Sequence, residues 1–181
     1  MKKLLLKNLI AIALFSISTI AFGQKFESPV LISSAGQSAD VKLVKMLAAR
    51  QKLDATTVLM ATKADLEGKK TLVIVPGFSS KGLGAAGISQ EDELKRVADL
   101  IKAANTMNIP IIMMHIGGNA RRFGQSDAFN TLVGNNAKHI IVVAQGDEDK
   151  FFTNLAGENE IPIEIVGKIA ESGVPLANLL K

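Results

Sequence analysis

The sequence predicts a single α/β domain in which a mostly parallel sheet lies between two layers of helices, doubly wound in the flavodoxin-like or Rossmann-like manner. Short apolar runs alternate with helical patterns along the chain, which is typical of this architecture. The central runs are apolar at successive positions, as expected of parallel strands covered by helices on both faces. Pro29, Pro110 and Pro162 stand at the starts of expected strands, where a missing N–H does least harm.

The expected elements follow in order. Strands are expected at residues 29–33, 56–61, 71–75, 110–116, 139–144 and 162–166. Helices are expected at residues 39–52, 89–107, 126–133 and 150–156, with a helix at 168–180 that Gly173 and Pro175 interrupt. Ser89 and Asp92 match a capping box at the start of the helix at 89–107. The short join at residues 62–70 is near the lower limit for a parallel crossover, so the strand before it is either parallel or an antiparallel edge strand.

The first 23 residues have the features of a secretory signal peptide. Lys2, Lys3 and Lys7 precede an apolar run, and the small residues Ala21 and Gly23 predict cleavage after the glycine. The alternative is an uncleaved membrane anchor. The sequence thus predicts export to a periplasm or the extracellular space, a mature domain at residues 24–181, and no stable membrane insertion after cleavage.

The composition excludes several functional classes. Of the 21 basic and 17 acidic residues, three lysines lie in the signal segment, so 18 basic residues against 17 acidic ones leave the mature chain nearly neutral. A nucleic-acid partner is therefore not expected, since it needs a basic surface. The absence of cysteine excludes disulfides, thiol catalysis and thiolate metal sites. No metal site is predicted, because His115 and His139 are expected at opposite edges of the sheet.

Four polar segments that contain glycine follow expected strands, at residues 34–38, 76–89, 117–127 and 145–150. They meet at the carboxyl edge of the sheet, where such folds bind ligands. The candidate ligand-binding residues are Ser34, Gln37, Ser38, Ser79, Ser80, Lys81, Gly82, Gly84, His115, Gly117, Gly118, Arg121, Arg122, Ser126 and Asp147.

The segment at residues 76–89 contains a formal G-x-G-x-x-G pattern that starts at Gly82. A dinucleotide fingerprint begins directly after its strand and is followed by an acid at the end of the next strand. Here six residues intervene, and the next strand ends in His115 and Ile116. The pattern therefore predicts no particular cofactor. It is either a ligand loop or a mobile structural loop whose glycines permit positive φ.

Arg121 and Arg122 are the best candidates for holding an anion, because a guanidinium binds carboxylate or phosphate through two hydrogen bonds. The alternatives are a solvated surface pair, or a pair bound to the acids at residues 147–149. His115 is either a pocket group or a structural histidine. Ser79 and Ser80 lack the second glycine of a nucleophile elbow.

The loops resemble those of a family of small exported bacterial proteins with no assigned reaction. The resemblance rests on residues 31–40, 79–88, 115–122 and 142–152, together with Ser126 and Asp127. It implies export and one α/β domain, and it transfers no catalytic role.

The function predicted first is an exported domain that binds a small, anionic molecule at the carboxyl edge, with a homodimer or a transporter partner able to complete the site. One alternative is a hydrolase of phosphate or acyl groups that uses His115 and Asp147. Another is a non-catalytic accessory subunit of a membrane transporter.

Overall fold

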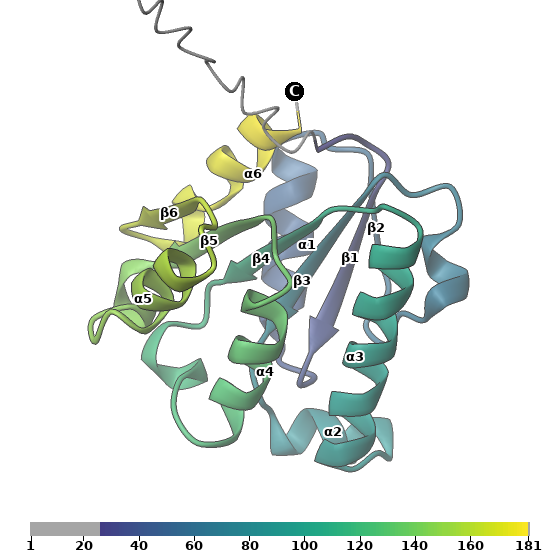
Figure 1. The fold of residues 1–181 in the computed structure, drawn as a ribbon, viewed down its shortest axis with the longest axis horizontal. Coiled ribbons are helices and arrows are strands. Elements are labelled where there is room, and N and C mark those ends of the chain that lie inside the picture. The colour runs from purple at the N-terminus through teal and green to yellow at the C-terminus, as the bar shows by residue number, and fades with distance from the viewer. Residues whose placement is uncertain (1–25, 181) are drawn as a thin grey trace, which may run out of the picture.

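The computed structural model describes residues 26–180, so the predicted signal peptide lies outside the described residues. Six strands form one sheet in the order β2-β1-β3-β4-β5-β6, and every neighbouring pair is parallel (Figure 1). The strand β2 lies on one side of β1, and β3 to β6 follow in sequence order on the other side of β1. This order defines a flavodoxin-like topology. The strands are β1 (Val30–Ala35), β2 (Ala55–Thr57), β3 (Thr71–Pro76), β4 (Ile111–His115), β5 (His139–Val143) and β6 (Ile163–Val166).

Helices cover both faces of the sheet, which confirms the predicted three-layer α/β/α fold (Figure 1). One face packs against α1 (Asp40–Arg50) and α6 (Gly173–Leu179). The other packs against α3 (Gln90–Thr106), α4 (Gln125–Gly134) and α5 (Phe151–Glu158).

Successive residues of each central strand enter different cores, which explains the absence of polar alternation in the sequence. In β3, Val73 and Val75 pack beneath α1 and α6, while Leu72 and Ile74 pack beneath the other helices. All four are fully buried. Each such side chain stabilises the fold by about 1.5–3 kcal/mol relative to an exposed one.

The crossover from β2 to β3 is parallel, so the antiparallel alternative for this strand is excluded. The strand is also shorter than predicted, ending at Thr57. Its crossover contains a single 3₁₀ turn, η1 (Lys63–Leu66), and buries Leu66. One such turn is enough to return the chain across β1.

Two predictions of local structure were wrong. Residues 76–89 do not form one long loop, because α2 (Ser80–Ala86) occupies half of that segment. Gly173 starts α6 instead of interrupting it, and Pro175 lies in the first turn, where its missing N–H removes no helical hydrogen bond. The predicted start of α3 at Ser89 is confirmed by a capping box, in which Ser89 Oγ accepts from Asp92 N–H at 3.0 Å.

Candidate functional site

The segments after β1 and β3 are joined to each other at the carboxyl edge. Gly77 N–H donates to Ala35 C=O and Ser79 N–H to Gly36 C=O, both at 2.8 Å. An isolated antiparallel bridge pairs Gln37 with Phe78. The crevice at the reversal of strand order is therefore closed by the protein's own backbone. Two hollows lie at this edge beside α2.

Helix α2 corrects the interpretation of the glycine-rich segment. Ser79 caps the helix by accepting from Gly82 N–H at 3.1 Å, and Gly87 ends it in the left-handed conformation with a φ of 69°. A Cβ on Gly82 would lie 2.1 Å from the carbonyl oxygen of Gln37, whereas a Cβ on Gly84 would meet nothing within 4 Å. Gly82 thus allows α2 to pack on the loop after β1, and neither glycine belongs to a flexible ligand loop.

Arg121 is half-buried and is held at two of its three guanidinium nitrogens. Nε donates to Ser38 Oγ at 3.2 Å and lies 3.4 Å from Asp40 Oδ2. Nη1 donates to the carbonyl of Phe78 at 3.3 Å. The side chain fits because Gly117 has none: a Cβ there would lie 2.2 Å from Arg121 Cγ. Arg121 is therefore oriented by the protein before any ligand arrives.

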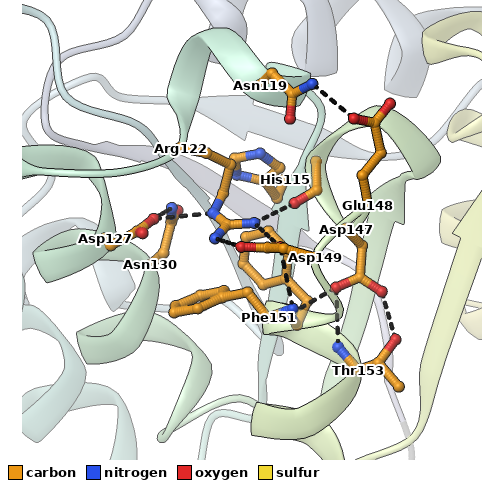
Figure 2. A network of polar contacts seen from close by, with 12 residues as sticks. His115, Asn119, Arg122, Asp127, Asn130, Asp147, Glu148, Asp149, Phe151 and Thr153 are labelled. Carbon is orange, nitrogen blue, oxygen red and sulfur yellow. Dashed lines mark hydrogen bonds and ion pairs between the residues drawn. The ribbon is translucent and has the colours of Figure 1, made fainter.

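Arg122 is buried within a network of acids and rings, so the expectation that it contacts a ligand is not supported (Figure 2). Its two terminal nitrogens donate to both oxygens of Asp149 at 2.9 Å, and Nε donates to Asp127 at 3.0 Å. Nη1 also donates to the carbonyl of Gly146. The guanidinium lies 4.2 Å from the ring centroid of Phe151.

The pairing with Arg122 has a clear effect on its partner. The hydrogen bonds from the guanidinium lower the pKa of Asp149 to about 2. The alternative that the sequence left open, an arginine bound to the acids at residues 147–149, therefore describes Arg122. It joins the segment after β4 to the segment after β5.

His115 is a structural histidine. Its side chain is fully buried, and Nε2 lies 3.2 Å from the carbonyl of Gly118. A carbonyl only accepts, so Nε2 carries the proton. The ring packs against Phe152 at 4.5 Å between centroids. Burial lowers its pKa to about 4, so the imidazole is neutral at physiological pH.

Asp147 caps α5 and does not contact His115 in a catalytic pair. Its Oδ1 accepts from Phe152 N–H at 2.7 Å and from Thr153 N–H at 3.1 Å, and Oδ2 accepts from the Thr153 hydroxyl (Figure 2). The carboxylate is buried. His139 begins β5 at the amino edge of the sheet and lies 3.1 Å from Glu164. Neither histidine is therefore placed to activate a serine at the carboxyl edge.

The remaining predicted serines mostly support backbone. Ser34 is buried, and its hydroxyl has no hydrogen-bond partner among residues 26–180. Ser38 Oγ accepts from Asp40 N–H at 3.1 Å, and Ser126 Oγ accepts from Phe78 N–H at 3.2 Å.

A buried ion pair at the end of β1 was not singled out from the sequence. Glu93 on α3 is fully buried and accepts from Arg96 at 2.7 Å, from Gln37 Nε2 at 2.9 Å and from Gly36 N–H at 2.9 Å. Arg96 also donates to the carbonyl of Ser34 at 2.6 Å. The spacing of three residues between an acid and a base on one helix was the available signal. The pair fixes the loop after β1 to α3.

An apolar groove of about 600 Å³ lies between α2, the start of α1 and the segment after β2. We call it the groove. Two side chains on its wall, Leu59 and Met60, are exposed apolar residues. Lys42 and Lys81 also line it. Its full lining is Gln37, Ser38, Ala39, Val41, Lys42, Leu59, Met60, Ser79, Lys81, Gly82, Ala85 and Ala86.

A smaller and more polar depression of about 340 Å³ lies on the other side of the first turn of α2. We call it the polar hollow. It is bounded by the start of α2 and by the segment that leads into α4. Its lining is Phe78, Ser79, Ser80, Lys81, Ala120, Arg121, Arg122, Phe123, Gln125 and Ser126.

The predicted site residues thus separate into four groups. The groove gathers Gln37, Ser38 and Gly82, the polar hollow gathers Ser80, Arg121, Arg122 and Ser126, and Ser79 and Lys81 line both. Ser34, Gly84, His115, Gly117, Gly118 and Asp147 line neither. Within residues 26–180 there is no group of three or more histidines and acids that could hold a metal ion, and no helix long and apolar enough to cross a membrane.

The fold and the site define an α/β domain of flavodoxin-like topology with two hollows at its carboxyl edge. The chain belongs to the family described as a domain of unknown function (DUF6305), which it matches over residues 27–180. No match was found among curated proteins.

Solved structures resemble the chain in fold alone. A flavodoxin from Pseudomonas aeruginosa is 15% identical with a TM-score of 0.42, covering 83% of this chain and 97% of its own. A psychrotrophic esterase from Pseudoalteromonas sp. is 15% identical with a TM-score of 0.32, covering 76% of each chain. A putative acylhydrolase from Bacteroides fragilis is 11% identical with a TM-score of 0.35, covering 88% of each chain.

Proposed function

We propose that this protein is an exported binding domain for a small organic anion, which lies in the groove. The groove itself is the observation that carries the proposal. Its volume of about 600 Å³ falls within the roughly 300–1,000 Å³ typical of ligand pockets. It lies at the carboxyl edge, where doubly wound folds bind ligands. Export rests on the signal-peptide features of residues 1–23.

The groove suits a ligand with an apolar body. Leu59 and Met60 are 43% and 37% exposed, and they line it together with Ala85 and Ala86. Covering exposed apolar surface contributes about 25 cal/mol per Å² removed from water. Most of the affinity would therefore come from the apolar body of the ligand.

Two lysines make the groove selective for a negative charge. Lys42 on α1 and Lys81 on α2 are exposed, and neither forms an ion pair with another residue in the described part of the chain. An exposed ion pair contributes about 0.2–1 kcal/mol, so each lysine adds modestly to affinity. Together they favour an acid over a neutral analogue of the same shape.

Calorimetric titration with octanoate and with octanol tests the proposal. Octanoate should bind more tightly than octanol, and Lys42→Ala or Lys81→Ala should each weaken octanoate binding several-fold without changing octanol binding. Lys45→Ala is the matched control, since Lys45 is exposed on the same helix and lies outside the groove. Ala85→Phe should fill the groove and abolish binding of both. The proposal fails if neither compound binds, or if Ala85→Phe binds both as wild type does.

The hydrolase alternative has no support in the geometry, because Asp147 caps a helix and His115 is sealed in the core. The accessory-subunit interpretation stays a prediction. Co-purification of the tagged protein with a membrane protein from its host would be the result expected for it.

A further inference from the structure

We infer that the anion bound in the groove continues into the polar hollow, so that the ligand is a phosphodiester joining an alkyl chain to a polyol or sugar. The inference rests on the proposed function and deepens it. The alkyl chain lies in the groove, the phosphate lies near Lys81, and the hydroxylated group enters the polar hollow.

The two hollows are adjacent and share a cation. Ser79 and Lys81, at the start of α2, line both of them. The first turn of α2 is therefore the only element that the lining residues have in common, and a charge placed beside Lys81 is next to both spaces. A ligand whose negative charge lies in its middle, with unlike groups at its two ends, matches this arrangement.

Arg121 supplies a second, oriented donor on the hollow side. Its Nε and Nη1 are engaged by Ser38, Asp40 and Phe78, while Nη2 makes none of the hydrogen bonds found within residues 26–180. The side chain is 28% exposed and lines the polar hollow. A donor that is already immobilised loses little conformational entropy when it binds a ligand oxygen.

Two hydroxyl groups in the polar hollow retain a proton to donate. Ser79 Oγ accepts from Gly82 N–H, and Ser126 Oγ accepts from Phe78 N–H. Neither hydroxyl donates to an acceptor within the described part of the chain. Ser80 and Gln125 add further polar groups to the lining. This set of donors and acceptors suits a ligand that carries the hydroxyls of a polyol better than it suits a ligand with an apolar surface.

Phe123 gives the polar hollow one flat apolar wall. It is 59% exposed, and its backbone has a φ of 65°, which is uncommon and strained for a side chain of this size. Its ring centroid lies 5.0 Å from the guanidinium carbon of Arg122, which Asp127 and Asp149 hold in place. A strained, exposed ring beside polar groups suits the C–H face of a polyol or sugar.

Two matched phosphodiesters test the inference by calorimetric titration below their micellar concentrations. Octyl methyl phosphate has the chain and the charge, and octyl glyceryl phosphate adds only the polyol; an octyl glucosyl phosphate distinguishes a sugar from glycerol. Wild type should bind at least one of the hydroxylated diesters about tenfold more tightly than the methyl diester. Phe123→Ala should remove that advantage and leave binding of the methyl diester unchanged. Met107→Ala is the control, because Met107 is also an exposed apolar residue but lies outside both hollows.

The outcomes separate the two proposals. If all three diesters bind equally and Phe123→Ala changes none of them, the inference is wrong while the proposed function stands. If the advantage persists in Phe123→Leu but not in Phe123→Ala, an apolar wall suffices and the inference holds. If neither the diesters nor octanoate binds, both proposals are wrong.

Discussion

Replacing Gly82 with alanine tests why the glycines of α2 are there. Its Cβ would lie 2.1 Å from the carbonyl oxygen of Gln37, far inside van der Waals contact. That carbonyl cannot easily move, because the bridge from Gln37 to Phe78 and the hydrogen bond from Ser79 to Gly36 hold the loop. Gly84, two residues along the same helix, would place its Cβ in open space.

The magnitude follows from two opposing effects. Alanine stabilises an exposed helical position by about 0.5–1 kcal/mol relative to glycine. Overpacking costs about 1–3 kcal/mol. The cost of Gly82→Ala falls at the upper end of this range, because the atom that the new Cβ would meet belongs to the backbone. The net expectation is about 2 kcal/mol of destabilisation for Gly82→Ala and about 1 kcal/mol of stabilisation for Gly84→Ala. In a domain of this size, 1 kcal/mol shifts Tm by about 2–4 °C.

Thermal unfolding followed by circular dichroism measures both variants against wild type. Gly82→Ala should lower Tm by about 4–8 °C, and Gly84→Ala should raise it by about 2–4 °C. Gly82→Ala should also weaken octanoate binding, since α2 must move away from the loop that lines the groove. Equal shifts of Tm in the two variants would refute the packing role assigned to Gly82.

Three further changes test the buried polar groups. Burial lowers the pKa of His115 from 6.5 to about 4. The protein therefore has its full stability at pH values above 6.5, the pKa in the unfolded chain, and loses stability as the pH falls below it. Between about pH 7.5 and about pH 5 the free energy of unfolding decreases by about 2 kcal/mol. Urea unfolding should therefore show a smaller pH dependence in His115→Asn than in wild type, with His139 contributing equally to both, and identical slopes would contradict this. Glu93→Gln, which leaves the partly buried Arg96 without its buried countercharge, should destabilise by about 3 kcal/mol, whereas the exposed Glu91→Gln should change stability by less than about 0.5 kcal/mol in the same urea assay. Arg122→Lys should destabilise by about 2 kcal/mol, because an ammonium cannot reproduce its paired hydrogen bonds and ring contacts; a thermal shift indistinguishable from wild type would show that these contacts matter little.

The layers of the fold could be predicted because each element carried its own signal. The run at residues 72–75 is apolar at successive positions, and it lies in a strand buried on both faces. Ser89 and Asp92 predicted the start of α3 through local chemistry alone. Helix α2 was missed because two of its seven residues are glycines, which disfavour helices. Its stability depends on contacts with Gln37, which is distant in sequence.

The candidate site was predicted in place but not in detail. The carboxyl edge follows from topology, and Ser79, Lys81 and Arg121 do line its hollows. Arg121 and Arg122 are neighbours in sequence with different surroundings, one half-exposed and one buried among acids. The nearby Asp127 does not reveal which arginine it pairs with, and Asp149 and Asp40 come from other segments, so no local pattern distinguishes the two arginines. Leu59 lies within a stretch expected to be a strand, and Ala85 was considered only as part of a glycine-rich loop, so the apolar wall of the groove was not foreseen.

The two ends of the described chain pack into the same core. Phe26 belongs to the cluster that also contains Leu176, with Leu179 and Leu180 packed against it. They lie at the amino edge of the sheet, where Glu27 N–H donates to Thr71 at 3.0 Å, while α2 lies at the opposite edge (Figure 1). A protein immobilised through either end would therefore present the groove and the polar hollow away from its support, so surface-based binding measurements can use either terminus without masking them.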